Sequence, residues 1–179
     1  MMWLALWACG GAPEPTEPAA EFACVDRAIT PSAEPFRLLW AGDTLIGDRA
    51  TEHIKKSGFD WPLANLAPAL AGADYRILNA EAPITNEETV FQPTRRWTYH
   101  TDPQVAEAFA RWGFDAAGLS NNHAMDRGPK GLFETVALLK RAGVQPFGAG
   151  RNRSEALAPL IVKTTHGKIG VIALGQTWS

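Results

Sequence analysis

The stretch GFDAAGLSNNHAMDRGPKGLFETVALLKRAGVQPF, residues 113–147, decides the fold. It opens with a short apolar run, residues 114–120, of the kind that forms a buried strand. After a polar loop, apolar side chains recur with helical period from Pro129 to Ala142, and Gly143 ends the helix. A second short apolar run, residues 144–147, predicts another strand. Strands that alternate with helices in this way predict an α/β fold with a largely parallel sheet.

The same alternation continues toward the N-terminus. Apolar runs at residues 36–42 and 75–81 predict two further buried strands. Asp102 followed by Pro103 favours a helix start, because Asp caps helices and Pro suits the first helical position. We expect that helix to stop at Gly113.

Three other segments complete the predicted elements. Residues 62–70 are rich in Ala and Leu and favour a helix that Pro68 ends or kinks. Residues 83–101 form a long loop, and loops of that length often carry function. Near the end, Asn152 and Glu155 resemble a capping box that opens a short helix, and residues 160–175 predict a hairpin.

Composition excludes several classes of protein. The 179 residues are 46% apolar and 20% charged, which is typical of one globular domain. The net charge of −2 argues against a nucleic-acid partner, because phosphate recognition needs clustered Lys and Arg. The only two cysteines, Cys9 and Cys24, provide neither a disulfide framework nor a CxxC metal site.

The N-terminal segment resembles a bacterial lipoprotein signal. Residues 1–8 would be the signal and residues 9–35 a Pro- and Glu-rich tether ahead of the folded part, residues 36–179. Leu6, Ala8 and Cys9 fit the usual lipobox, whereas Trp7 is bulky and the basic n-region is missing. Cys9 would then carry the lipid. A frayed apolar tail and a disulfide between the two cysteines are the alternatives.

Polar side chains cluster just past three predicted strands, where α/β proteins place their ligands. Carboxylates, amide oxygens and an imidazole that converge there would suit Zn, Mn, Fe or Mg. Asp43 or Glu81 alone would more often cap a helix or form a turn. The prediction of a metal site therefore rests on the position that all three clusters share, at the ends of strands. The candidate residues are Asp43, Asn79, Glu81, Asn121, Asn122, His123 and Asp126.

Four consecutive segments carry a family resemblance. GDTLIGD (42–48), NAEAPIT (79–85), the stretch 113–144 and FGAGRNRSEAL (147–157) resemble, in order, the motifs of the CapA-type capsule and poly-γ-glutamate synthesis proteins. The resemblance covers residues 36–179. It implies a calcineurin-like metallophosphoesterase-type layered α/β sandwich. This chain would contain only the first half of that sandwich and would be truncated after it.

The resemblance also implies roles for single residues. Asp43 would be the first metal carboxylate, and Glu81 would take the bridging position. Asn122 would ligate the second metal ion. His123 would ligate metal and act on the leaving group, and Asp126 would orient it.

The sequence departs from the phosphoesterase pattern in its histidines. Leu45 stands where those enzymes have a ligating His. The other histidines, His53, His100 and His166, lie in polar contexts that favour solvated side chains rather than ligands. We therefore expect this chain alone to bind metal weakly or not at all, and to be inactive.

Two motifs that would indicate other functions are incomplete in this sequence. FGAGRN suggests a dinucleotide-binding loop, but Arg153 occupies the position of the third glycine. Ser120 lacks the glycines of a nucleophile elbow, which argues against a serine hydrolase.

The leading hypothesis is a metal-dependent, hydrolase-like protein anchored by lipid to the membrane of a bacterial cell envelope. Its partner would be an envelope polymer or a precursor of one, with polymer synthesis or export subunits as further partners. A non-catalytic accessory subunit of such a machine is the rival. A third alternative is an inactive fragment whose sheet leaves an apolar face exposed.

Overall fold

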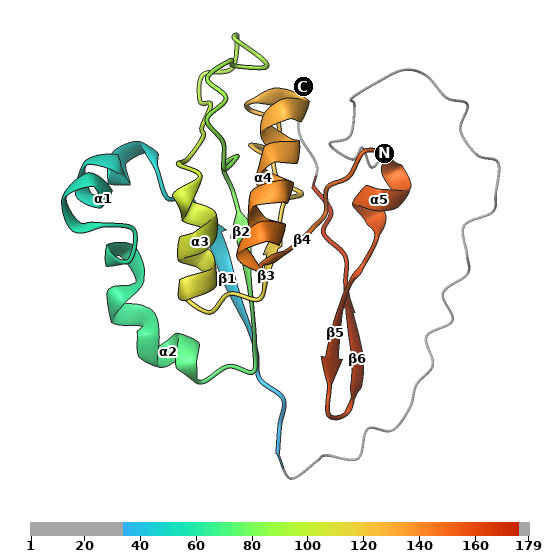
Figure 1. Cartoon of the computed structure of the whole chain (residues 1–179). Helices are drawn as coiled ribbons and strands as arrows, with labels where there is room; N and C mark the ends of the chain where they lie inside the picture. The colour runs from blue at the N-terminus through green and yellow to red at the C-terminus, as the bar shows by residue number, and fades with distance from the viewer. Residues whose placement is uncertain (1–33, 176–179) are drawn as a thin grey trace, which may run out of the picture.

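The computed structural model describes residues 34–175, which build around one parallel four-stranded sheet (Figure 1). The strands stand in chain order, and each pairs in parallel with the next. The predicted α/β class and parallel sheet are thereby confirmed. The strands are β1 (Leu38–Thr44), β2 (Tyr75–Ala80), β3 (Ala116–Gly118) and β4 (Gln145–Phe147).

Helices connect the strands, and two of them cover one face of the sheet. The helices α3 and α4 pack on β2 and β3 through an apolar core that includes Leu78, Ala117, Phe109 and Leu139 (Figure 1). The helices are α1 (Thr51–Ser57), α2 (Ala67–Ala71), α3 (Gln104–Arg111), α4 (Gly128–Ala142) and α5 (Arg153–Leu157), with short 3₁₀ helices at Asp48–Ala50 and Trp61–Leu66.

A hairpin covers the opposite face of the sheet. Its strands, β5 (Leu160–Thr164) and β6 (Gly167–Val171), pair antiparallel, as the sequence predicts. Leu160 and Val162 pack against Ile77 of β2 and Ala116 of β3. Because side chains alternate along a strand, Ile77 faces the hairpin while its neighbour Leu78 faces the helices.

The helix boundaries follow the predicted caps. The side-chain oxygen of Asp102 accepts a hydrogen bond from Gln104 N (2.8 Å) at the start of α3. Gly113 and Gly143 follow α3 and α4 with φ of 80° and 87°, a region that glycine enters without strain. Asn152 caps α5 by accepting from Glu155 N at 2.9 Å.

Two sequence predictions are corrected. The strand predicted as buried at residues 36–42 is β1, which among residues 34–175 pairs only with β2. Its side chains are therefore half-buried or exposed, and Trp40 is 54% exposed. The helix predicted at residues 62–70 is a 3₁₀ helix followed by α2. Pro68 lies in the first turn of α2, where its missing N–H costs no hydrogen bond, so it opens a helix instead of ending one.

Two further points concern the predicted membrane tether. Within residues 34–175, no helix is both long enough and apolar enough to cross a bilayer. The proposed signal, the lipidated Cys9, the possible Cys9–Cys24 disulfide and nearly all of the tether lie outside the described residues and stay predictions.

Candidate functional site

The first two predicted clusters meet at the carboxyl ends of neighbouring strands. Asp43 of β1 and Asn79 of β2 are register partners, next to an irregularity in the pairing of the two strands. Asn79 Nδ2 donates to Asp43 Oδ1 at 2.7 Å. The amide therefore fixes one oxygen of the Asp43 carboxylate and leaves the other available to a ligand.

Asn121 joins the third cluster to the second. Its Nδ2 donates to Asn79 Oδ1 (3.1 Å) and to the backbone oxygen of Ala80 (2.9 Å). Its Oδ1 accepts from His123 N (2.9 Å). These three bonds engage the whole amide group, so Asn121 holds Asn79 and the neighbouring backbone in position.

His123 and Asp126 form a buried pair behind this amide chain. His123 is 8% exposed, and the Asp126 side chain is fully buried. The ring Nδ1 lies 2.7 Å from Asp126 Oδ2. Because an ionised carboxylate only accepts hydrogen bonds, Nδ1 carries the proton and Nε2 stays free. That free nitrogen faces Glu81 Oε1 at 4.0 Å.

The long loop between β2 and α3 completes the surroundings of Asp126. Tyr99 N donates to Asp126 Oδ2 (2.7 Å), and Arg95 Nη1 donates to Asp126 Oδ1 (3.2 Å). The Tyr99 ring packs on the imidazole of His123 with 4.6 Å between centroids. The sequence marked this loop as functional by its length alone, and no motif singled out the two contact residues.

Glu81 experiences an electrostatic conflict. Burial raises the pKa of its carboxyl group, and the nearby carboxylates of Asp43 and Asp126 raise it further, while His123 opposes them. Burial is the largest cause, and the two carboxylates add to it because like charges so close together disfavour ionisation.

The candidate side chains are of the types that bind metal ions, but too few of them converge among the described residues. Carboxylate oxygens and imidazole are suitable ligands for transition metals. Within residues 34–175, however, no three His, Cys, Asp or Glu side chains converge closely enough to hold one. Asn122 is exposed, and the contact that it makes is through its backbone oxygen, which accepts from Arg95 Nη1 (2.7 Å). The proposed ligand set stays a prediction.

The remaining histidines have partners elsewhere. The His53 ring stacks on Trp61 at 5.0 Å between centroids, and His166 Nε2 bonds the backbone oxygen of Glu34 at 3.0 Å. His100 Nδ1 lies 2.8 Å from Arg127 Nη2. His100 is therefore half-buried in a contact, where the sequence favoured a solvated side chain.

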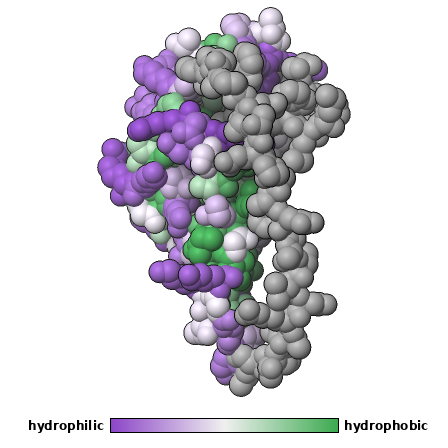
Figure 2. All heavy atoms as spheres, turned by 90° about the vertical axis from the view of Figure 1, so that its right-hand side faces the viewer, coloured by the Kyte–Doolittle hydropathy of each residue, from purple (hydrophilic) through white to green (hydrophobic). Residues whose placement is uncertain are grey.

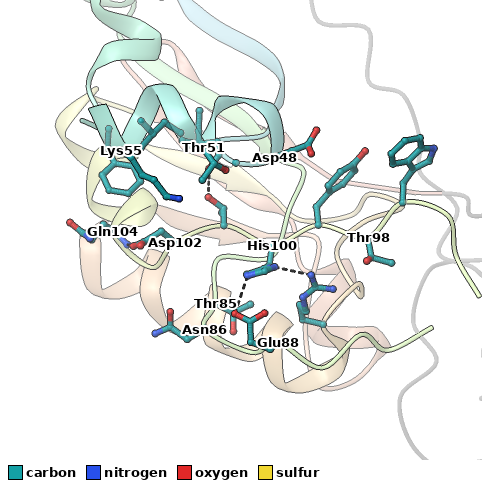
Figure 3. Close-up of a pocket in the computed structure, with 18 of the residues that line it drawn as sticks. Asp48, Thr51, Lys55, Thr85, Asn86, Glu88, Thr98, His100, Asp102 and Gln104 are labelled. Carbon is teal, nitrogen blue, oxygen red and sulfur yellow. Dashed lines mark hydrogen bonds and ion pairs between the residues drawn. The ribbon is translucent and has the colours of Figure 1, made fainter. Parts of the chain in front are cut away.

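A pocket of about 820 Å³ opens beside the His123–Asp126 pair. Two of its lining residues adjoin that pair: the Tyr99 ring packs on His123, and Arg127 directly follows Asp126 in the sequence. Figure 3 shows Asp48 and Thr51 on one side of the pocket, Asn86 and Glu88 on the other, and His100 between them. The pocket is large enough for several groups of a ligand and adjoins the candidate site through Tyr99, although none of Asp43, Glu81, Asn122, His123 and Asp126 lines it.

Comparisons with known proteins identify relatives for this arrangement. The family model described as bacterial capsule synthesis protein PGA_cap matches residues 37–179. The capsule biosynthesis protein CapA of Bacillus anthracis is 27% identical over 146 residues, which cover 80% of this chain and 35% of that protein. The PGA biosynthesis protein CapA of Bacillus subtilis is 24% identical over 138 residues, covering 77% and 36%.

A probable polyglutamine synthesis accessory protein of Mycobacterium tuberculosis is 31% identical over 108 residues, covering 59% of this chain and 28% of that protein. The chain spans about a third of the length of the curated relatives that it matches. The matched region coincides with the segment in which the motifs resemble the CapA-type proteins. The chain belongs to the bacterial capsule synthesis protein family PGA_cap.

Proposed function

We propose that this protein contributes a metal-dependent, hydrolase-like site that acts on a phosphate- or amide-containing polymer of the cell envelope, or on its precursor. The observation that carries the proposal is the geometry of His123. Asp126 fixes the protonated Nδ1, and Nε2 faces Glu81 at 4.0 Å, where it can exchange a proton.

This geometry suits general acid–base catalysis. A neutral imidazole with a free Nε2 accepts a proton from an attacking group, and the imidazolium returns it to a leaving group. The buried Asp126 carboxylate would stabilise the imidazolium in between. Arg95 and Tyr99 hold that carboxylate in place, so its orientation does not depend on substrate.

The metal would supply a Lewis acid and an activated water. Asp43, Glu81 and Asn122 are the side chains that we propose as ligands, because a metal ion on His123 would occupy Nε2, the nitrogen that the acid–base role requires. The raised pKa of Glu81 supports a cation at this position. The described chain provides only part of a ligand set, and further ligands would come from the remainder of the complete protein.

The finer fold and the setting in the cell are part of the proposal. Helices on one face, a hairpin on the other and a site at the strand ends support a calcineurin-like layered sandwich. Lipidation at Cys9 would anchor the protein to the envelope membrane. The relatives named for capsule and PGA biosynthesis support an envelope polymer as the substrate.

The test uses the complete protein with its metal content measured. We expect His123→Gln to lower hydrolysis of an envelope-polymer substrate at least ~100-fold, the scale of a lost acid–base group. Asn122→Ala should lower metal content as well as activity. Arg141→Met, an exposed substitution at the far end of α4, is the control. Unchanged activity and metal content in both site variants would contradict the proposal.

A second candidate is a non-catalytic accessory subunit that keeps the scaffold for binding. Two observations favour it: Leu45 in place of a ligating His, and the lack of a three-residue metal cluster among residues 34–175. A relative named as a probable accessory protein fits this alternative. Metal analysis separates the two, since a binding scaffold would hold no stoichiometric transition metal.

A further inference from the structure

We propose that the pocket beside His123 is an oxyanion-binding subsite, and that Arg127 is the cation that binds a carboxylate or phosphate group of the ligand. The binding itself does not require the hydrolase chemistry. Its role as a substrate subsite rests on the proposed function, because it lies next to the His123–Asp126 pair.

The first step is the environment of Arg127. The residue is 7% exposed and lines the pocket. Its Nη2 donates to His100 Nδ1 (2.8 Å), and its Nη1 has a long bond to the backbone oxygen of Asp126 (3.4 Å). Its buried Nε has no acceptor. Among residues 34–175, no salt bridge involves this guanidinium, although neighbouring Arg95 reaches the Asp126 carboxylate.

The second step is energetic. Burying a cation without an anionic partner is costly, and an unsatisfied buried donor adds to that cost. Arg127 is also the N-cap residue of α4, a helix of 15 residues, so its charge stands at the positive end of the helix dipole. All three costs fall on one side chain. An oxyanion in the pocket would offset all three, because it would pair with the guanidinium and accept from Nε.

The third step concerns the other charges of the pocket. Asp48, Glu88 and Asp102 are exposed, and so are the cations Lys55 and Arg96. Exposed charges at a pocket mouth are weakened by water and salt. The buried Arg127 is screened least, so it determines the sign of the preferred ligand at the inner end. Arginine also matches carboxylate and phosphate geometry with paired N–H donors.

The pocket adjoins the proposed catalytic pair through Tyr99, while His123 and Asp126 themselves do not line it. Tyr99 lines the pocket and packs its ring on His123, and Asp126 directly precedes Arg127 in sequence. A ligand whose oxyanion is held by Arg127 would have to extend past Tyr99 to bring a further group to His123. An acidic polymer, with repeated anionic groups, meets this requirement.

The experiment measures binding by calorimetry with three probes: inorganic phosphate, pentaglutamate and the neutral pentaglutamine. We expect at least one anionic probe to bind, with affinity at least ~10-fold lower in Arg127→Met, the scale of a lost charge-assisted contact. Arg141→Met removes the same charge outside the pocket and should bind like the parent protein. The anionic probe that binds identifies the source of the oxyanion. Equal binding of pentaglutamine, or no effect of Arg127→Met, would overturn the inference.

Two further variants keep the outcome interpretable. If Arg127→Met does not fold, Thr51→Trp fills the pocket from α1 and should weaken anion binding while Arg127 stays in place. Binding that persists in that variant would also overturn the inference. His123→Gln should keep anion binding even where it abolishes hydrolysis, so failure of the proposed function and failure of the subsite are distinguishable.

Discussion

At the scale of single residues, Glu81 and Arg127 carry charges that their surroundings do not balance. Burial raises the pKa of the Glu81 carboxyl and nearby carboxylates raise it further, and Arg127 is a buried cation with no salt bridge among residues 34–175. Residues placed for stability alone are seldom arranged in this way, because each conflict lowers the stability of the folded state. We interpret both as positions where a ligand of opposite charge binds.

A stability measurement tests the conflict at Glu81. A carboxyl whose pKa is raised in the folded state contributes stability below its ordinary pKa of 4.5, and loses that contribution as pH rises through the folded value. In metal-free protein we therefore expect Glu81→Gln to be more stable than the parent at pH 7, and the difference to disappear below pH 4.5. Thermal unfolding in EDTA at both pH values measures this.

The matched control is Glu107→Gln, which removes the same charge from the exposed surface of α3. It should give no comparable gain at pH 7. If Glu81→Gln is less stable than the parent at pH 7, the Glu81 carboxylate of the parent is balanced by favourable contacts in the folded protein, and the prediction is wrong.

At the scale of elements, α4 holds the loop that surrounds the site. Thr135 Oγ1 accepts from Ile84 N (2.8 Å), and Lys130 Nζ lies 2.5 Å from Glu87 Oε2. The same loop then supplies Arg95 and Tyr99 to Asp126. A helix that begins at the site therefore also fixes the loop that covers it.

The buried contact of Thr135 can be tested directly. Thr135→Val keeps the shape of the side chain but leaves Ile84 N without its acceptor in a fully buried position. We expect a loss of about 1–3 kcal/mol in the free energy of unfolding, the cost of an unsatisfied buried donor. Urea unfolding measures it. Thr135→Ser, which retains the hydroxyl, is the control, and equal stability of Thr135→Val and the parent would refute the role of this bond.

At the scale of the whole molecule, the hairpin side exposes apolar surface. Figure 2, which views the right-hand side of Figure 1, shows hydrophobic surface along the middle of this face. Ile161, Ile169, Ile172 and Leu174 are each 39–54% exposed. Within the described residues β6 pairs only with β5, so one of its edges offers unpaired backbone groups. These side chains belong to the hairpin and the segment that follows it, whereas the apolar face expected from the sequence was that of the main sheet, which helices and hairpin cover on its two sides.

This surface predicts self-association of the 179-residue chain. Apolar side chains beside an open strand edge favour contact between copies. We expect Ile172→Lys combined with Leu174→Lys to reduce the sedimenting mass and the binding of a hydrophobic dye. Phe133→Lys, on the exposed side of α4, is the control and should change neither. A parent chain that sediments as a monomer and binds no dye would contradict the prediction.

The sequence by itself determined the α/β class, the order of the strands along the chain and most helix ends. These features depend on short-range signals: apolar periodicity, the Asp102 and Asn152 caps, and the glycines after α3 and α4. It also placed polar residues at the strand ends. Because the strands are parallel, those ends meet at one edge, so Asp43, Asn79 and Asn121 come together as expected.

Only the tertiary structure decided which surroundings each residue acquired. The position of β1 at the sheet edge depends on which strands become neighbours, and a strand's own residues do not specify that. The contacts of Asp126 with Arg95 and Tyr99 span 31 and 27 residues. The buried Arg127 contacts His100 of the same loop, 27 residues away in the sequence. Interactions of this range leave no periodic pattern in the sequence, because they form only when a long loop folds back onto a distant helix.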